Sequence, residues 1–373
     1  MKNISISLVR QPYQYQVFIG QGILNGALAD LILHHPEPVV FVVTNDRVNA
    51  LYPDRIAKAL PAGFTAKLLV LPDGERYKTL DTLSLIFDFL AKEGANRKSL
   101  LVAFGGGVIG DMVGFAAASY MRGMSFVQVP TTLLSQVDSS IGGKTAVNHP
   151  SGKNSIGAFK QPLQTIIDVD FLATLPPREF LAGYAELVKH GFIADSYLYQ
   201  LLHKTTLEAL SQNAPMLIEA ISRSCQVKAN VVEKDERESF ARAMLNFGHT
   251  LGHFIETYTN YDQYLHGEAV IAGMDFAAFW SVRRGLLSPS DYKLIGQHLA
   301  QLGLKITYPK VNQSTFFEII GHDKKSSAQG LNFIGLNSLG QGVIVAQVQL
   351  KEIWETYQAY LVSEGALIQE TVP

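Results

Sequence analysis

Three of the ten histidines of this chain lie in one segment, LNFGHTLGHFIETYTNYDQYLHGEAV, at positions 249, 253 and 266. His249 and His253 are four residues apart in an amphipathic pattern typical of a helix, so both share one face. His266 follows a Tyr- and Asn-rich break and precedes a second run of helical apolar periodicity. Imidazoles this close together indicate a metal site, and spacing alone favours the pair on one helix. Buried or capping histidines are commoner than metal ligands, so spacing leaves the choice of ligands open.

A carboxylate with a similar ambiguity stands earlier in the chain. Glu186, in the run GYAELVKHG, lies among apolar helix positions, and Lys189 follows three residues later on the same face. This spacing is equally typical of a simple intrahelical ion pair and of a buried functional carboxylate.

A glycine turn predicts a dinucleotide site. Gly105, Gly107 and Gly110 fit the pattern G-x-G-x-x-G after a predicted strand and at the start of a predicted helix. This context lets backbone N–H groups approach a pyrophosphate at the helix N-terminus. No acid ends the next strand about twenty residues on, and the turn follows the third predicted strand instead of the first. A dehydrogenase of the usual Rossmann layout is therefore disfavoured, and a ligand-free βα turn is the alternative.

Two Gly-Lys loops indicate recognition of a small anion. The run DSSIGGKT is not a P-loop, because the position that needs the first glycine holds Asp138, whose carboxylate would repel a phosphate. Gly142 and Gly143 still form a donor-rich turn beside Lys144, and the run HPSGKNSIGAF brings a second lysine and Asn154. Solvated surface loops are the alternative interpretation.

The elements that must position these residues fall into two groups. Predicted strands at 38–46, 66–75, 99–104 and 125–132 alternate with helices at 48–60, 80–95 and 105–121. Such alternation predicts right-handed βαβ units and a parallel, Rossmann-like sheet. After residue 175 the pattern is almost entirely helical, apart from a predicted strand pair within 331–348. We therefore expect an α/β domain at 1–175 and a mainly α-helical domain at 176–373.

Composition excludes several classes of protein. The chain has 373 residues, of which 47% are hydrophobic and 17% charged, as in a globular protein with two cores. A net charge of −2 argues against a general nucleic-acid or membrane-surface binder. No apolar run approaches the ~20 residues that span a bilayer. The only cysteine, Cys225, permits no internal disulfide and is expected to be a buried structural thiol in a cytoplasmic protein.

Long runs of the chain resemble 3-dehydroquinate synthase, the sugar phosphate cyclase of the shikimate pathway, which leads to aromatic amino acids. They are GGGVIGDMVGFAAASYMRG, VPTTLLSQVDSSIGGKTAVNHPSGKNSIGAFKQP, LNFGHTLGHFIE and LHGEAVIAGM. The resemblance implies that NAD is oxidised and reduced again within one catalytic cycle on 3-deoxy-arabino-heptulosonate 7-phosphate. Phosphate is eliminated between the two hydride transfers, and an intramolecular aldol closure gives 3-dehydroquinate.

The resemblance also implies a role for individual residues. The metal ligands, for zinc or cobalt, would be Glu186, His249 and His266, and an open coordination position would suit substrate hydroxyls. The NAD positions would be Asp73, Gly74, Glu75, Arg76, Tyr77, Lys78, Gly106, Gly107, Val108, Ile109, Gly110, Asp111, Thr131, Thr132, Lys144, Lys153, Phe171, Leu172, Ala173, Thr174 and Glu179. The substrate positions would be Asp138, Lys144, Asn154, Lys189, Lys228, Arg242, Asn246, His253 and Lys324.

Two further expectations come from the same resemblance. Arg122, in the run YMRG, would reach into the site of a second subunit, which implies a homodimer. His190 departs from the aromatic residue expected after Lys189, and its titration near pH 6.5 would change the local charge.

Two other activities stay open. A different sugar phosphate cyclase would act on a sugar without the carboxylate, although Asn154, Arg242, Asn246 and His253 together match the dehydroquinate pattern. A metal-dependent polyol or glycerol-phosphate dehydrogenase would not need the anion cluster of Lys228, Arg242 and Lys324. A non-catalytic NAD- or metal-binding module is disfavoured, because every motif position is intact.

Overall fold

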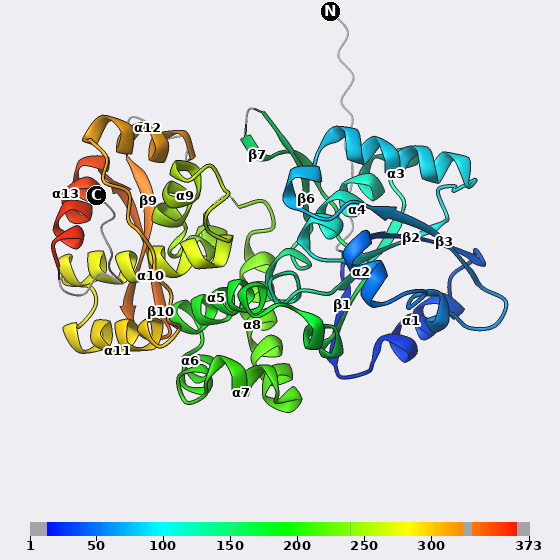
Figure 1. The fold of residues 1–373 in the computed structure, drawn as a ribbon, viewed down its shortest axis with the longest axis horizontal. Helices are drawn as coiled ribbons and strands as arrows, with labels where there is room; N and C mark the ends of the chain where they lie inside the picture. The colour runs from blue at the N-terminus through cyan, green and yellow to red at the C-terminus, as the bar shows by residue number, and fades with distance from the viewer. Residues whose placement is uncertain (1–12, 151, 239, 324–329, 364–373) are drawn as a thin grey trace, which may run out of the picture.

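The computed structural model describes residues 13–150, 152–238, 240–323 and 330–363. Its two halves lie side by side, with the sheet of the first half and the helices of the last third on opposite sides of a central group of helices (Figure 1). No helix within the described residues is long and apolar enough to cross a membrane.

The first half is built on a six-stranded parallel sheet. Its strands are β1 (Gln16–Gly20), β2 (Val39–Asn45), β3 (Thr65–Leu71), β4 (Leu100–Gly105), β5 (Ser125–Pro130) and β8 (Gln164–Asp168). They lie in the order β1-β8-β5-β4-β2-β3, and every neighbouring pair is parallel. Four of these strands and the parallel sheet confirm the sequence prediction, whereas β1 and β8 were not predicted.

Helices cover both faces of this sheet because the strands are apolar on both sides. The helices are α1 (Leu24–Leu33), α2 (Asp46–Leu51), α3 (Leu80–Lys92) and α4 (Gly107–Ser119), with short helical turns η1 (Ala57–Ala59), η2 (Glu75–Tyr77) and η3 (Tyr120–Arg122). On β2, Phe41 and Val43 join a core with α3 and α4, while Val40 and Val42 join a second core with α1 and η1. This alternation is what a strand period of two produces when both faces are buried.

A hairpin of β6 (Lys144–His149) and β7 (Gly152–Phe159) extends from the sheet domain between the two halves (Figure 1). The sequence predicts glycine-flanked loops in this segment, because it lacks the apolar alternation of a half-buried strand. Backbone hydrogen bonds between the two strands form the hairpin instead. Between β5 and β6 lies the helical turn η4 (Ser135–Ser139), and η5 (Val169–Thr174) follows β8.

The second half is mainly helical, as predicted. Its elements are α5 (Pro177–Ile193), α6 (Ser196–His203), α7 (Leu207–Ser211), α8 (Ala214–Lys234), η6 (Ala241–Asn246), α9 (His249–Tyr258), α10 (His266–Arg283), α11 (Pro289–Ala300), α12 (Gln313–Asp323) and α13 (Leu350–Leu361). The expected strand pair is present as β9 (Leu331–Ser338) and β10 (Gln341–Val348), which are antiparallel. One large apolar core joins these elements and includes Cys225, which is buried as predicted.

Helices α9 and α10 pack unusually closely. A side chain at Gly273 of α10 would overlap the carbonyl oxygen of Gly248, the residue that precedes α9. Gly248 itself has a φ of 81°, a conformation that favours glycine. The close approach brings the first residue of α9, His249, beside the first residue of α10, His266.

Candidate functional site

The predicted dinucleotide positions gather at one edge of the parallel sheet. They follow the carboxyl ends of β3, β4, β5 and β8, the edge at which ligands bind in open α/β sheets. Gly106 is the N-cap of α4 and makes no side-chain cap bond, so the first N–H groups of that helix keep their capacity for an anion. A Cβ atom at Gly107 would lie 3.0 Å from Ser139 Oγ, so glycine at this position allows the backbone of the turn to lie close to Ser139.

Lys78 connects three parts of this edge. Its ammonium lies 2.5 Å from Asp111 Oδ2 on α4 and 2.5 Å from Asn154 Oδ1 on β7. Burial raises the pKa of Asp111 above its ordinary value, and Lys78 opposes that effect. Glu75 accepts a hydrogen bond from the Asn148 side chain in the hairpin, and the Asn148 N–H donates to the Lys78 carbonyl oxygen. With the contact between Lys78 and Asn154, three hydrogen bonds join the loop after β3 to the hairpin.

The remaining dinucleotide positions border the same edge. Thr131 donates its N–H to the Gly105 carbonyl oxygen, and the Tyr52 hydroxyl lies 2.7 Å from Thr174 Oγ1. Glu179, in the first turn of α5, has a raised pKa because it is partly buried and because Asp73 adds a like charge, against the opposing effect of Arg47. The acids of the β3 loop and of α5 therefore face one another across the sheet edge.

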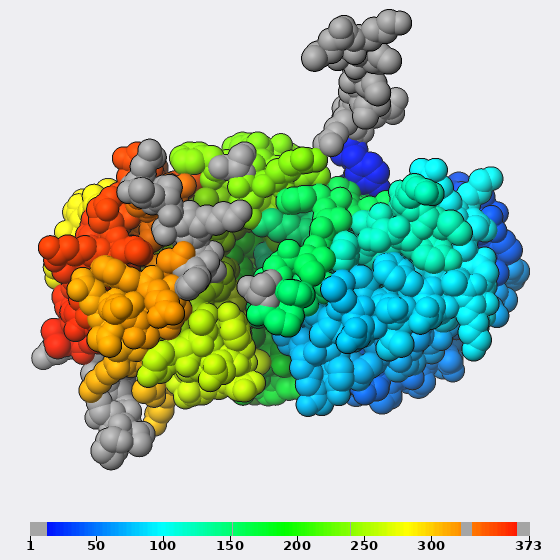
Figure 2. All heavy atoms as spheres, turned by 90° about the horizontal axis from the view of Figure 1, so that it is seen from above, coloured from blue at the N-terminus to red at the C-terminus, as the bar shows by residue number. Residues whose placement is uncertain are grey.

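A buried group of cations lies where the two halves meet. Lys228 on α8 donates to Asp138 Oδ1 at 2.5 Å, and Lys189 on α5 forms an ion pair with Glu186. Burial alone would raise the pKa of Asp138, but Lys228 and Lys189 outweigh it and hold the pKa far below its ordinary value. Asp138 is thus a carboxylate, and the space-filling view shows a hollow between the two halves, with green segments of the middle of the chain within it (Figure 2).

A second polar group borders this hollow. The Arg242 guanidinium donates to the carbonyl oxygens of Gly142, at 3.3 Å, and Glu236, at 2.7 Å. Asn246 donates to Glu238 Oε1 at 3.2 Å, and Lys144 forms an ion pair with the other oxygen of the same carboxylate.

The predicted metal ligands converge on one point. The ligand atoms of Glu186, His249 and His266 all lie within 4.8 Å of one another, and His249 Nε2 lies 4.0 Å from Glu186 Oε1. Two ligands that each lie about 2.1 Å from one ion are at most about 4.2 Å apart, so His249 and Glu186 are close enough to share a zinc-sized cation. Glu186 is 1% exposed, and neither of its oxygens accepts a hydrogen bond from the described residues, although Lys189 pairs with one of them.

The orientation of both imidazoles fits a cation as well. His249 Nδ1 lies 3.2 Å from the Phe247 carbonyl oxygen, and His266 Nδ1 lies 3.1 Å from Glu256 Oε2. Because each acceptor engages the Nδ1–H, each ring keeps its Nε2 lone pair for a metal. The His253 ring lies 5.4 Å from that of His249 and 6.0 Å from that of His266, so the third imidazole borders the same point.

Several predicted residues lie apart from these contacts. Lys153 faces Glu256 at 3.7 Å and the Tyr261 ring at 5.2 Å, in the second half of the chain. Arg122 is exposed at the end of α4 and makes no hydrogen bond or ion pair with the described residues. Lys324 lies outside the described residues.

His190 does not behave as the sequence suggested. The ring is fully buried and its Nδ1 lies 2.6 Å from Ser224 Oγ. Burial, with Lys189 adding a like charge, holds the pKa of His190 well below its ordinary value. A charge change near pH 6.5 is therefore the wrong expectation, because the imidazole stays neutral there.

Sequence reasoning also missed two acids that belong to this region, Glu238 and Glu256. We place both acids in the site because each contacts a predicted residue: Glu238 pairs with Lys144, and Glu256 accepts a hydrogen bond from His266. Glu256 could have been found from its spacing, because it lies three residues after His253 and seven after His249, on the same helix face.

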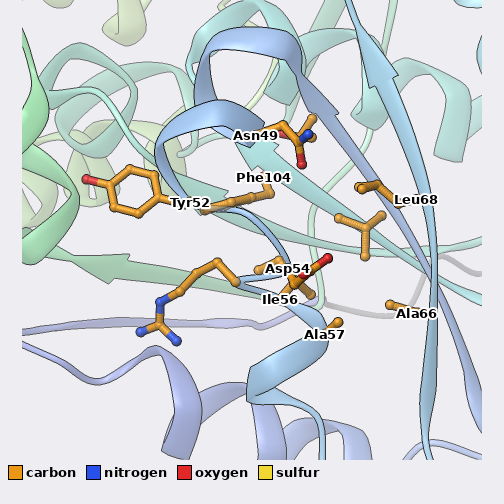
Figure 3. A pocket seen from close by; sticks show the side chains of 11 residues that line it. Asn49, Tyr52, Asp54, Ile56, Ala57, Ala66, Leu68 and Phe104 are labelled. Carbon is orange, nitrogen blue, oxygen red and sulfur yellow. The ribbon is translucent and has the colours of Figure 1, made fainter.

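A separate hollow lies between β2, β3 and the segment that joins α2 to η1. Thr44, Asn49, Tyr52, Asp54 and Phe104 are among its lining residues (Figure 3). None of the predicted site residues lines it, although the hydroxyl of the lining residue Tyr52 contacts Thr174.

Comparison with known proteins gives a consistent result. Residues 68–182 match the family profile "3-dehydroquinate synthase N-terminal", and residues 183–326 match "3-dehydroquinate synthase C-terminal". The chain is 46% identical over 350 residues to 3-dehydroquinate synthase of Neisseria meningitidis serogroup C (strain 053442), covering 94% of this chain and 97% of the relative. It is 48% identical over 315 residues to 3-dehydroquinate synthase of Geotalea uraniireducens (strain Rf4), covering 84% and 88%.

Solved structures agree on the fold and its relatives. The chain resembles 2-epi-5-epi-valiolone synthase of Streptomyces hygroscopicus subsp. jinggangensis 5008, solved with NAD⁺ and Zn²⁺, with a TM-score of 0.86 and 26% identity over 95% of this chain and 99% of that one. It also resembles 2-deoxy-scyllo-inosose synthase solved with carbaglucose-6-phosphate, NAD⁺ and Co²⁺, with a TM-score of 0.81 and 27% identity over 92% and 96%. The predicted fold class is confirmed, and the chain belongs to the 3-dehydroquinate synthase family.

Proposed function

We propose that this protein converts 3-deoxy-arabino-heptulosonate 7-phosphate into 3-dehydroquinate and phosphate, as an NAD- and metal-dependent lyase. The observation that carries the proposal is that three groups adjoin one another: the glycine turn of α4, the buried cations, and the cluster of a carboxylate with two imidazoles. The glycine turn approaches Ser139 of η4, the neighbouring Asp138 pairs with Lys228, and Lys189 pairs with Glu186 of the cluster. Identities of 46% and 48% to 3-dehydroquinate synthases over most of the chain support it.

The two halves would divide the chemistry between them. The boundary that we propose, after residue 175, assigns the sheet with the dinucleotide positions to 1–175 and the metal positions to 176–373. NAD would lie along the carboxyl ends of the strands, over the N-terminus of α4. Bound NAD supplies a hydride acceptor that returns the hydride in the same cycle.

Glu186, His249 and His266 would hold a zinc or cobalt ion. Such an ion acidifies a coordinated hydroxyl and leaves room for it, because three protein ligands do not complete its coordination. The site residues then orient the substrate and keep its charges paired. Lys189 and Lys228 supply positive charge beside Asp138, which suits a substrate that carries both carboxylate and phosphate.

The polar group around Glu238 would take part in binding. Arg242, Asn246 and Lys144 present donors to one side of the hollow, where Lys144 and Asn246 now engage the Glu238 carboxylate. An anionic substrate would offer the same donors an alternative carboxylate or phosphate. His253 lies beside the imidazole cluster, in reach of a substrate hydroxyl through water, and would relay a proton.

We propose further that the enzyme is a cytoplasmic homodimer. Arg122 is exposed and makes no hydrogen bond or ion pair within the described part of the chain, so it is available to the site of a second subunit. Met121 and Arg122 both have positive φ, at 50° and 62°, so the turn that presents this arginine is held in a strained conformation. A single, buried cysteine suits a reducing compartment.

A second cyclase activity is the alternative, because the solved neighbours named above form valiolone- and inosose-type rings. One experiment separates the candidates. Metal-loaded protein is given the heptulosonate phosphate with substoichiometric NAD, while free phosphate and NADH absorbance are followed together. Phosphate release over many turnovers without NADH accumulation supports the proposal. NADH that rises with substrate loss would make the protein a dehydrogenase, and turnover only with sugar phosphates that lack a carboxylate would make it another cyclase.

A further inference from the structure

The two imidazoles of the metal cluster differ in the group that accepts the hydrogen bond from Nδ1. For His249 it is the Phe247 carbonyl oxygen, two residues earlier in the chain, and for His266 it is the side chain of Glu256. We propose that Glu256 is the positioning residue of the metal site: its Oε2 accepts the Nδ1–H of His266 and so aims Nε2 at the metal, while Oε1 faces Lys153 of the β6–β7 hairpin. This inference rests on the proposed function and assigns a role within that same site.

Glu256 is buried where it meets His266. The side chain is 3% exposed, and an isolated carboxylate buried to that extent is costly unless it is paired. The 3.1 Å contact makes Glu256 Oε2 the acceptor for the His266 Nδ1–H, while Oε1 faces Lys153 at 3.7 Å.

Glu256 is less suited to be a metal ligand itself. Ligand atoms of His253, Glu256 and His266 also lie within 4.8 Å of one another, so this set competes with the one that contains Glu186. Both oxygens of Glu256 already face a nitrogen, at 3.1 Å from His266 Nδ1 and 3.7 Å from Lys153 Nζ. Glu186 also has an ion pair, between its Oε2 and Lys189, but its Oε1 accepts no hydrogen bond from the described residues and lies 4.0 Å from His249 Nε2. Glu186 therefore keeps one oxygen for a metal that His249 also faces, whereas both oxygens of Glu256 already face a nitrogen.

The two contacts of Glu256 differ in strength. The contact with His266 is a hydrogen bond of 3.1 Å to a buried carboxylate, and support of this kind typically contributes 10–100-fold to metal affinity. The Lys153 side chain is 35% exposed and its nitrogen is 3.7 Å away, and exposed ion pairs contribute about 0–1 kcal/mol. Loss of the lysine should therefore alter metal affinity by about fivefold at most.

The test uses four variants of the full-length protein and measures zinc affinity by chelator competition, without substrate. Glu256→Met removes both acceptors and is expected to weaken zinc binding roughly 10–100-fold. Glu256→Gln keeps an amide oxygen for His266 and should lie between Met and the native protein. Lys153→Met is the matched control for the other oxygen and should stay within about fivefold of the native value. Glu186→Gln provides the benchmark for loss of a ligand.

A second readout identifies the role directly. In metal-free protein labelled with ¹⁵N-histidine, His266 should carry its proton on Nδ1, and Glu256→Met should shift it toward Nε2. His249 serves as an internal control, because a backbone carbonyl holds its Nδ1 and neither substitution touches that bond. Glu256→Ala, which also removes both acceptors, gives this readout where the Met variant does not fold.

Three results would overturn the inference. The first is native zinc affinity in both Glu256 variants, and the second is an unchanged His266 tautomer in Glu256→Met. The third is a loss of zinc affinity in Glu256→Gln as large as in Glu186→Gln, which would make Glu256 a ligand. Failure of the proposed function is a separate outcome, because metal affinity and tautomer are measured without substrate. A chain that does not turn over the heptulosonate but loses zinc on Glu256→Met would retain this role for Glu256.

Discussion

Replacing Lys78 by Met should remove the cation that joins α4, the loop after β3 and the hairpin. The Lys78 side chain is only 5% exposed and that of Asp111 only 15%, so the ion pair is largely hidden from water. Methionine keeps most of the length and the apolar stem of lysine but carries no charge. Asp111 would then retain a buried carboxylate, and Asn154 would lose its donor.

The expected size of the effect follows from the geometry. At 2.5 Å, in an effective dielectric of about 20, the attraction between Lys78 and Asp111 is about 6–7 kcal/mol before desolvation is subtracted. Breaking a buried pair from one side typically costs about 3–5 kcal/mol. The variant can limit this cost by protonating Asp111. That escape costs about 1.4 kcal/mol for each pH unit above an unfolded pKa of about 3.9, or about 5 kcal/mol at pH 7.5 and about 1.5 kcal/mol at pH 5.

The sign of the pH dependence is therefore determined. In Lys78→Met the folded-state pKa of Asp111 rises further above its unfolded value, so the folded state binds more protons than the unfolded state. Stability then falls as pH rises through that window, and the loss caused by the substitution should be larger at pH 7.5 than at pH 5. Burial already raises the pKa of Asp111 in the native protein, so the direction is the same before and after the change.

Urea unfolding at both pH values checks this prediction. The set consists of the native protein, Lys78→Met, Asp111→Asn, and the double variant, in which both charges are absent. The double variant should recover most of the stability that Lys78→Met loses at pH 7.5, while its NAD affinity, measured by calorimetry, should stay low. An equal loss at both pH values, or a double variant whose loss is the sum of the single losses, would refute the reasoning.

Three further outcomes are expected. Burial, with a smaller contribution from His203, lowers the pKa of His298 to about 4. The stability that depends on a neutral His298 should therefore be complete above pH 6.5 and be lost as pH drops toward 4, with a loss of about 2 kcal/mol at pH 5. Urea unfolding of His298→Gln should show a shallower fall of stability over the same pH range. Gly273→Ala should lower the free energy of unfolding by about 1–3 kcal/mol and weaken metal binding, because α9 and α10 must separate. Gly296→Ala on α11 is the control: a Cβ there meets nothing within 4 Å, so this change should be neutral or stabilising when both variants are compared by thermal unfolding. Removal of the metal by a chelator should lower the free energy of unfolding by about 4 kcal/mol, if the free ion was a thousandfold above its Kd before removal. Recovery of this stability with zinc but not with magnesium would verify the ligand chemistry.

Much of the fold could be predicted from local patterns. The β-branched runs of β2 and β4 and the glycine turn into α4 read correctly, because strands buried on both faces are continuously apolar and a βα turn needs glycine. The helix with His249 and His253 was equally clear from its period. The β6–β7 hairpin was missed, because its polar, glycine-rich residues carry no strand period and its order comes from cross-strand pairing.

The chain by itself determined which chemical groups are present and that the two histidines of α9 share a face. It did not determine which imidazole would serve the metal, because spacing treats His249 and His253 alike. Only the tertiary structure brings these side chains together: the close packing of α9 on α10 places His266 beside His249, and the distant Glu186 lies in the same group. The same packing put Glu256 behind His266. Helix periodicity orders residues that are neighbours along the chain, whereas a coordination site needs side chains from several elements within a few ångströms, and only packing sets those distances.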